Sequence, residues 1–156
     1  MSSQEKDKES DAGVELATFY IGDALCGMDI LSVQEINKQL RITRVPQAPD
    51  YVLGVLNLRG RIVTVIDLGK KLGLTPTALS PESRNIIVDS SDEYIGLLVD
   101  GIGDVVAAGK DDVEPPPANI GRLKGKYFQG VLKTDDNLVG ILNIREVLKD
   151  ETLQAA

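Results

Sequence analysis

Two stretches of this chain match each other at a fixed spacing. When the chain is shifted by 76 residues, Tyr51, Gly54-Val55-Leu56 and Asp67-Leu68 fall on Tyr127, Gly130-Val131-Leu132 and Asn143-Ile144. The part that precedes them matches at a spacing of 69, which places Gly27-Met28 on Gly96-Leu97 and Glu35-Ile36 on Asp104-Val105. Such recurrence is typical of tandem duplication. The sequence therefore predicts two copies of one small unit, approximately residues 14–82 and 83–150, between tails at 1–13 and 151–156.

Short apolar runs between turn residues indicate that each unit is made of β-strands. The expected strands cover residues 16–21, 25–29, 41–45, 55–58, 62–68, 85–89, 94–99, 100–106, 127–133 and 138–144. Segment 30–36 fits either a helix or a strand, 69–73 is a short helix or turn, and the proline-rich segment 109–121 is an extended link. Asn143 and Glu146 have capping-box spacing, which predicts a C-terminal helix with an apolar stripe of Ile144, Val147 and Leu148.

Three of these runs, Ile62–Ile66, Ile86–Val88 and Ile95–Val99, are apolar at nearly every position. A strand that is open to water on one face alternates apolar and polar residues instead. Two small β-barrels that share a seam explain these runs, because a strand at the seam buries one face in its own barrel and the other against the neighbour. A single larger sandwich with buried central strands explains them equally well.

The chain contains no histidine and a single cysteine, Cys26. The missing histidines exclude Ser-His-Asp and Cys-His nucleophile systems and histidine-containing zinc sites. A lone cysteine forms no intrachain disulfide, which fits a reducing compartment. An enzyme that uses carboxylates alone stays possible, but the acidic segment 89–93 lacks the central glycine and distal glutamate of a calcium loop and is predicted to be a hairpin turn. We expect no cofactor and no metal.

A net charge of −7 argues against nucleic acid and against anionic lipid as partners. Aromatic residues are also scarce, with four Tyr, two Phe and no Trp, whereas a single-strand binder stacks bases on such rings. A small β-barrel that binds oligonucleotides is therefore the weaker alternative. No apolar run is long enough to span a membrane, and residues 1–13 lack the apolar core of a signal peptide. We expect a cytoplasmic protein.

Three motifs follow one another along the chain. They are Gly22-Asp23-x-x-x-Gly27-x-Asp29-Ile30-x-x-Val33-Gln34-Glu35-Ile36, Gly54-Val55-x-Asn57-Leu58-Arg59-Gly60-x-Ile62-Val63-x-x-Ile66-Asp67-Leu68 and Val99-Asp100-Gly101-Ile102-x-Asp104-Val105. These motifs resemble the CheW domain of chemotaxis coupling proteins. The resemblance extends from about Val14 to Leu148, and the order and spacing of all three motifs agree. It implies an all-β fold with minor α content, in which two pseudo-symmetric five-stranded SH3-like barrels exchange strands and a helix follows.

The resemblance also implies a function without chemistry. A CheW protein is a scaffold that binds the cytoplasmic tip of a chemoreceptor and the regulatory domain of the histidine kinase CheA, and so holds both in a membrane-bound array. Proteins that fuse this domain to a kinase or a receiver are longer than this chain. A coupling protein of a non-flagellar chemosensory array is the alternative within the family.

Five residues occupy positions that the resemblance assigns to receptor binding: Val33, Glu35, Gly54, Arg59 and Val105. Arg59 is either a solvated arginine beside a turn glycine or a planar fork that pairs with receptor carboxylates. Val33 and Val105, expected at near-equivalent repeat positions, are either core valines or the lining of a groove for a receptor helix. Glu35 is either a surface carboxylate or a neighbour of that groove, and Gly54 is expected to serve backbone geometry.

No residue is assigned to kinase binding. Two positions depart from the common family pattern, because Thr64 stands where many members carry a proline and Gly69 where many carry a basic residue. Neither departure bears on the argument for the fold, and Gly69 weakens the expectation of a partner contact just past that strand.

Overall fold

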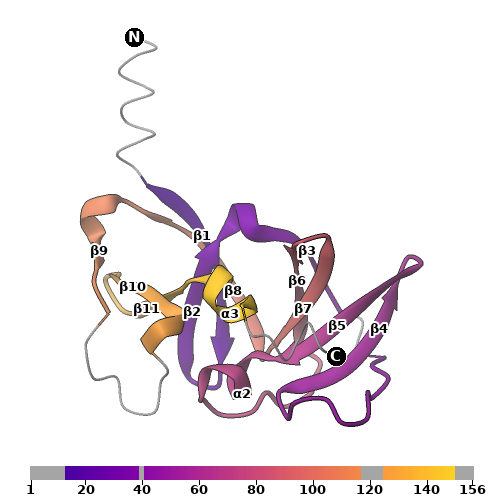
Figure 1. Cartoon of the computed structure of the whole chain (residues 1–156). Coiled ribbons are helices and arrows are strands. Elements are labelled where there is room, and N and C mark those ends of the chain that lie inside the picture. Colours follow the sequence, from indigo (N-terminus) through magenta and orange to yellow (C-terminus); the bar gives the residue numbers. More distant parts are fainter. Residues whose placement is uncertain (1–12, 39–40, 117–124, 150–156) are drawn as a thin grey trace.

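The structure is a computed structural model that describes residues 13–38, 41–116 and 125–149 (Figure 1). The first repeat contains β1 (Val14–Ile21), β2 (Ala24–Asp29), η1 (Ile30–Ser32), β3 (Val33–Asn37), β4 (Val52–Leu58), β5 (Arg61–Asp67) and α2 (Leu68–Leu72). The second contains β6 (Arg84–Ser90), β7 (Glu93–Val99), β8 (Gly101–Ala108), η2 (Lys110–Asp112), β9 (Val113–Glu114), η3 (Gly125–Tyr127), β10 (Phe128–Lys133), β11 (Leu138–Leu142) and α3 (Ile144–Leu148).

Most expected elements are confirmed, and three segments differ. Segment 30–36 divides into the short helix η1 and the strand β3. Residues 41–45 do not form a strand, because only Thr43 pairs, through a single bridge to Val55, before the chain bends at Pro46 and Gln47 with a φ of 64° at Gln47. The link after Gly109 holds η2 and β9 before Pro115, and its residues 117–121 lie outside the described part, as do tail residues 1–12 and 151–156.

The strands form two sheets, and the repeats exchange strands between them. The six-stranded sheet has the order β8-β1-β2-β11-β10-β9, and the five-stranded sheet has the order β3-β6-β7-β5-β4. The hairpin β1–β2 of the first repeat thus lies in the sheet of the second repeat, and β6–β7 lies in the sheet of the first. The parallel pairs show the same symmetry, because Val65 lies opposite Gly96 and Ile141 lies opposite Gly27. The exchange predicted from the family resemblance is confirmed.

The repeated residues make the same contacts in both copies. The N–H of Asp67 donates to the carbonyl of Tyr51 at 2.7 Å, and the N–H of Asn143 donates to that of Tyr127 at 2.8 Å. The side chains of Asp67 and Asn143 then cap α2 and α3 by accepting the N–H three residues later. Because the Asn143 N–H is engaged by Tyr127, the helix start is capped in one direction rather than by the reciprocal box that the spacing suggested.

Three apolar clusters explain the strands that are apolar on both faces. The shared core lies between the sheets and includes Phe19, Met28, Ile66, Ile86, Val88, Leu97, Phe128 and Val147. The first-barrel core includes Leu56, Val63, Val65, Ile87 and Leu98, and the second-barrel core includes Leu16, Ala108, Leu132, Val139 and Ile141. Neighbouring residues of β7, Leu97 and Leu98, therefore enter different clusters. The seam interpretation is confirmed, except that Ile62 is 64% exposed at the hairpin end of β5.

A lysine joins the repeats at one point of the shared core. Lys71 of α2 is buried, and its Nζ lies 4.1 Å from the ring centroid of Tyr51 and 5.6 Å from that of Tyr127. These two tyrosines are repeat equivalents, whereas the equivalent of Lys71 is the fully buried Val147. A cation between two aromatic rings is stabilised by both of them.

Candidate partner-binding site

Arg59 is held at the tip of the β4–β5 hairpin by the geometry of its turn. Leu58 pairs with Arg61, so Arg59 and Gly60 are the two loop residues, and both have positive φ, at 50° and 86°. This conformation matches the twist of the flanking strands. The carboxamide oxygen of Asn57 accepts the N–H of Gly60 at 2.8 Å and fixes the turn. The side chain of Arg59 is therefore projected from a rigid tip.

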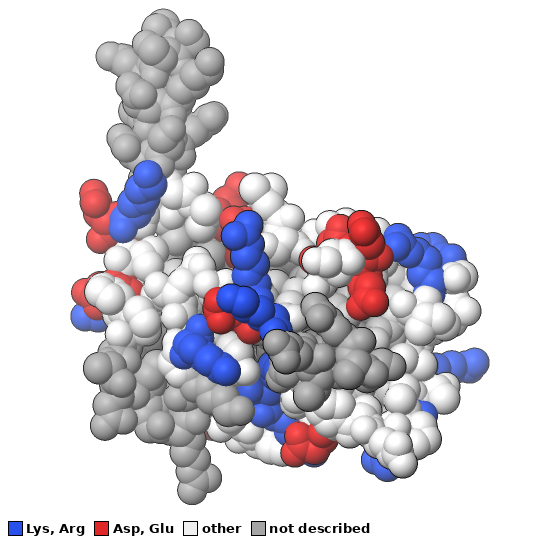
Figure 2. All heavy atoms as spheres, viewed as in Figure 1, with Lys and Arg blue, Asp and Glu red and all other residues white. Residues whose placement is uncertain are grey.

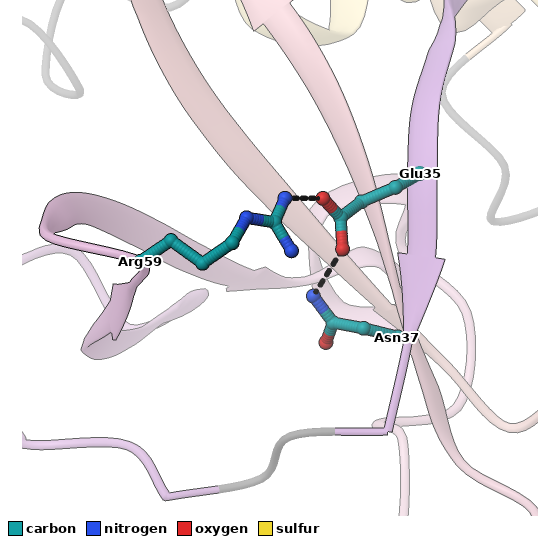
Figure 3. A network of polar contacts seen from close by, with 3 residues as sticks. All are labelled: Glu35, Asn37 and Arg59. Carbon is teal, nitrogen blue, oxygen red and sulfur yellow. Dashed lines mark hydrogen bonds and ion pairs between the residues drawn. The ribbon is translucent and has the colours of Figure 1, made fainter.

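The guanidinium of Arg59 forms an ion pair with the carboxylate of Glu35 (Figure 3). Glu35 lies on β3, at one edge of the five-stranded sheet, and Arg59 follows β4, at the opposite edge. The pair therefore connects the two edges across the mouth of the first barrel. The amide of Asn37 donates to the other carboxylate oxygen of Glu35 at 3.3 Å.

These contacts shift the pKa values of both partners. The hydrogen bond from Arg59 lowers the pKa of Glu35, and the amide of Asn37 adds a smaller lowering. The same bond raises the pKa of Arg59. The side chain of Arg59 is 71% exposed and that of Glu35 is 28% exposed, so the pair is formed at the surface. An ion pair in that environment adds little to stability.

A bulge places Val33 and Glu35 on opposite faces of β3. Residues directly opposite each other in an antiparallel pair share a face. Val33 lies opposite Val88 of the shared core, whereas Glu35 lies opposite Ile87 of the first-barrel core, because the register shifts between them. Val33 is half-buried and packs against the shared core. The structure thus joins Glu35 to Arg59 and separates both from the face of Val33.

Val105 lies on the corresponding edge of the other sheet. It is 53% exposed on β8 and lies opposite Ala17 of the shared core, as Ile102 lies opposite Phe19. The register makes Ile102 the equivalent of Val33 and Ile36 the equivalent of Val105. Val33 and Val105 are therefore three residues apart in the repeat alignment and not within one or two residues, as the sequence predicted. The repeat spacing of 69 in the sequence gives the same pairing as the structure. This pairing adds the half-exposed Ile36 and Ile102 to the candidate surface.

The segment that leads into β3 lies close to β8. Leu16 of β1 lies opposite Asp29 on one side and opposite Val106 on the other. Two strand spacings separate Asp29 from Val106, which is about 10 Å, and η1, which leads from Asp29 to Val33, contacts β1. We call Val33, Ile36, Ile102 and Val105 the seam residues, because all four lie opposite shared-core residues on the edge strands β3 and β8.

Gly54 serves the backbone, as the sequence predicted. It is buried, has a φ of 147°, and a Cβ there would overlap the carbonyl oxygen of Thr43. The Thr43–Val55 bridge covers it, with hydrogen bonds of 2.7 and 2.8 Å. Any influence of Gly54 on a partner therefore passes through the position of residues 41–45.

Other chemistry is sparse in the part of the chain that the structure describes. Burial raises the pKa of the Cys26 thiol to about 12, which makes this cysteine unreactive. No group of three or more Cys, Asp or Glu side chains is arranged to hold a metal ion within residues 13–38, 41–116 and 125–149. None of the described helices is long and apolar enough to cross a membrane. On the face shown in Figure 2, acidic and basic side chains are interspersed.

A family model described as the CheW-like domain matches residues 15–152. The chain belongs to the CheW family. It is 32% identical to the chemotaxis protein CheW of Helicobacter pylori over 150 residues, which cover 96% of this chain and 90% of the relative. It is also 32% identical to CheW of Treponema pallidum over 149 residues, covering 93% and 88%. The crystal structure of the scaffolding protein TtCheW from Thermoanaerobacter tengcongensis matches with a TM-score of 0.80 at 32% identity, covering 89% of this chain and 90% of that one.

Of the two departures from the common CheW pattern, Gly69 has a structural cause. A Cβ at Gly69 would overlap the carbonyl oxygen of Thr75, where the connector after α2 folds back over the helix. Gly69 is therefore accommodated by the fold of this chain, and the fold predicted despite this departure is confirmed. Thr64 is half-buried within β5, between Val55 and Ile95, and makes the regular ladder pairs of its strand.

Proposed function

We propose that the protein is a non-enzymatic chemotaxis adaptor, which binds the cytoplasmic tip of chemoreceptors and the regulatory domain of the histidine kinase CheA. In this role it holds receptor and kinase in a cytoplasmic array at the membrane and lets the receptor control the kinase. The observation that carries the proposal is the set of seam residues, which are apolar and partly exposed on the two outermost strands beside the shared core. Apolar side chains in such a place suit an amphipathic helix of a partner.

The ion pair of Glu35 and Arg59 extends this surface with charge. Guanidinium has five N–H donors, so Arg59 keeps its bond to Glu35 while it binds a carboxylate of the receptor. Gly54 contributes through the backbone that it allows. The receptor site thus combines an apolar part, Val33 and Val105 with their equivalents, and a charged part on the other face of β3.

The decisive experiment is co-sedimentation with receptor cytoplasmic fragments and CheA, with each partner present or omitted. Val105→Asp and Ile36→Asp place a charge on side chains that are already 53% and 41% exposed, so both variants are expected to fold. We expect each to weaken receptor binding at least about tenfold, the equivalent of 1.4 kcal/mol, with an unchanged denaturation midpoint. Leu79→Asp is the matched control, because Leu79 is 61% exposed on the connector and lies outside the seam.

Two results contradict the proposal at different levels. Normal sedimentation of Val105→Asp and Ile36→Asp with receptor would remove the seam as the receptor site. Failure of the unmodified protein to sediment with either receptor or CheA would remove the adaptor function itself.

A further inference from the structure

The two edge strands that carry the seam residues, β3 and β8, each contain a bulge. In β8 two residues, Gly103 and Asp104, lie opposite the single residue Thr18 of β1. In β3 the register shifts between Val33 and Glu35. The spacing of 69 residues makes these two bulges repeat equivalents.

The bulge in β8 decides which side chains share a face of the strand. In a regular strand the faces alternate, so residues that are three apart, such as Ile102 and Val105, would point to opposite sides. The extra residue of the bulge brings them to one side, where Ile102 lies opposite Phe19 and Val105 lies opposite Ala17 of the shared core. The seam residues of β3 are related by the same spacing. Each half of the apolar surface therefore depends on a bulge.

The two bulges are held in different ways. In β3 the bulge residue Glu35 is held through its side chain, by the ion pair with Arg59, and lies opposite the buried Ile87. In β8 the equivalent residue, Asp104, is held through its backbone, because the hydroxyl of Thr18 donates a hydrogen bond to its carbonyl at 2.5 Å. Thr18 is 2% exposed and is the repeat equivalent of Ile87.

Gly103 makes room for this hydroxyl. A Cβ at Gly103 would lie 2.5 Å from the Oγ1 of Thr18. At Gly101, two residues earlier on the same strand, an added Cβ would meet only the ring of Tyr20, at 4.0 Å. In β3, where an isoleucine takes the place of Thr18, the equivalent of Gly103 is Gln34. Thr18 and Gly103 are therefore matched to each other.

We propose that Thr18 is a positioning residue of the receptor-binding surface, because its hydroxyl fixes the β8 bulge and so holds Ile102 and Val105 on one face. The inference rests on the proposed adaptor function and deepens it. A residue that is 2% exposed acts on a partner only through the side chains that it positions. A bulge also interrupts the regular N–H and C=O spacing of an edge strand, which disfavours the addition of a partner strand. The surface therefore suits a partner helix, which binds through side chains.

The first test compares two substitutions of Thr18 in co-sedimentation with a receptor cytoplasmic fragment. Thr18→Val keeps the shape of the side chain and removes the hydroxyl, so the carbonyl of Asp104 loses its partner. We expect receptor binding to weaken about fivefold. Thr18→Ser keeps the hydroxyl and is expected to bind within about twofold of the unmodified chain. Denaturation midpoints are measured for every variant, so that binding is compared only where the protein is folded.

Two matched controls separate positioning from general stability. The hydroxyl of Thr77, in the connector, also donates to a backbone carbonyl, that of Leu98, at 3.4 Å. Thr77→Val removes a bond of the same kind outside the seam and is expected to bind receptor like the unmodified chain. Gly103→Ala is expected to displace the Thr18 hydroxyl and to weaken binding about fivefold, whereas Gly101→Ala is expected to leave binding unchanged.

A second measurement follows the seam residues without any receptor. Residues directly opposite each other on neighbouring strands have Cβ atoms about 4.5–5.5 Å apart and give nuclear Overhauser effects. We expect the effects from Val105 to Ala17 and from Ile102 to Phe19 to weaken in Thr18→Val and to persist in Thr77→Val. A role of Thr18 in stability alone would leave them unchanged in both variants.

Receptor binding by Thr18→Val that equals that of the unmodified chain would overturn the positioning role. An equal loss of binding in Thr77→Val would overturn it as well, because lower stability would then account for both. The adaptor function is tested separately by the unmodified chain. If that chain does not sediment with receptor, the adaptor function falls, and the Overhauser effects still decide whether Thr18 sets the bulge.

Discussion

The two hairpin tips of the molecule occupy equivalent places and carry opposite charges. At the tip of β4–β5, Arg59 reaches Glu35 on the far edge of the first barrel. At the tip of β10–β11, the equivalent of Arg59 is Asp135, and the equivalent of Glu35 is Asp104. Two carboxylates repel each other, so the second barrel closes without this ion pair. The comparison teaches that a barrel of this fold closes without the pair.

A second contrast lies at the other ends of the barrels. The connector after α2 is held against that helix by the hydrogen bond from Thr77 to Asp67, whereas a hollow of about 990 Å³ lies beside α3. The two repeats therefore share a plan of strands and caps and differ in the surfaces that they leave available. Substituting a residue and its repeat equivalent tests where this symmetry holds.

The largest effect is expected in the shared core. Leu97→Ala and its repeat equivalent Met28→Ala remove side chains that are fully buried in the same cluster, so each is expected to lower the free energy of unfolding by about 2–5 kcal/mol. Because the repeats exchange strands, both variants are expected to unfold in one transition. Denaturant titration followed by circular dichroism and by tyrosine fluorescence measures this. Two separated transitions would mean that the repeats are independent.

Next in size is the difference between two equivalent glycines. Gly54→Ala combines a φ of 147° with overlap of the Thr43 carbonyl and is expected to destabilise by about 2–3 kcal/mol. In Gly130→Ala the new Cβ meets first the Val113 side chain at 2.5 Å, which can move, and no positive φ is involved. We therefore expect a smaller loss at Gly130. Equal losses in denaturant titrations would show that the Thr43 bridge yields as easily as a side chain.

The two helix-cap substitutions are expected to differ less in their loss of stability than the two glycine substitutions. Asp67→Ala removes both the cap of α2 and the carboxylate that holds Thr77, whereas Asn143→Ala removes the cap of α3. We expect losses of about 2 and about 1 kcal/mol, respectively. Hydrogen exchange of the Thr77 amide is expected to accelerate in the first variant alone. An unchanged exchange rate there would contradict the role of Asp67 in fixing the connector.

The smallest effect on stability is expected from Arg59→Ala, compared with Asp135→Ala. Arg59 lies at the surface, so its removal is expected to leave the denaturation midpoint nearly unchanged, and receptor binding is expected to fall. The pKa of Glu35 should rise toward its ordinary value, because the hydrogen bond that lowers it is gone. Carboxyl NMR titration measures this shift. A pKa that stays low would mean that the hydrogen bond from Asn37 is enough to lower it.

The lowered pKa of Glu35 also sets the sign of a pH effect. A carboxyl with a folded-state pKa below its unfolded value contributes stability above the unfolded pKa, about 4.3, and loses it as the pH falls through the folded pKa. The ion pair is therefore complete at neutral pH and breaks only in acid, below that value. Asp135→Ala should leave this acid dependence unchanged.

The sequence contained most of the fold, because the repeat spacings of 69 and 76 already fix which strands are equivalent. They also pair Val33 with Ile102, as the structure confirms. The bulge in β3 was not predictable, because a regular strand would place Val33 and Glu35 on one face. The Glu35–Arg59 contact was not predictable either, since it depends on how far the sheet curls before its edges meet. The need for a glycine at residue 69 was not predictable, because it depends on the close approach of the Thr75 carbonyl in the connector.

The exchange of hairpins has a consequence for how the chain is made. The hydroxyl of Thr18 donates a hydrogen bond to the carbonyl of Asp104, 86 residues later. Strand β2 pairs with β11, which lies near the end of the described chain. While the protein emerges from the ribosome, its first hairpin has two open edges and no partner strand. Such edges attract other nascent chains. A chain stalled before β11 is therefore expected to need chaperones, since the six-stranded sheet, which holds the first hairpin, is incomplete until β11 is released.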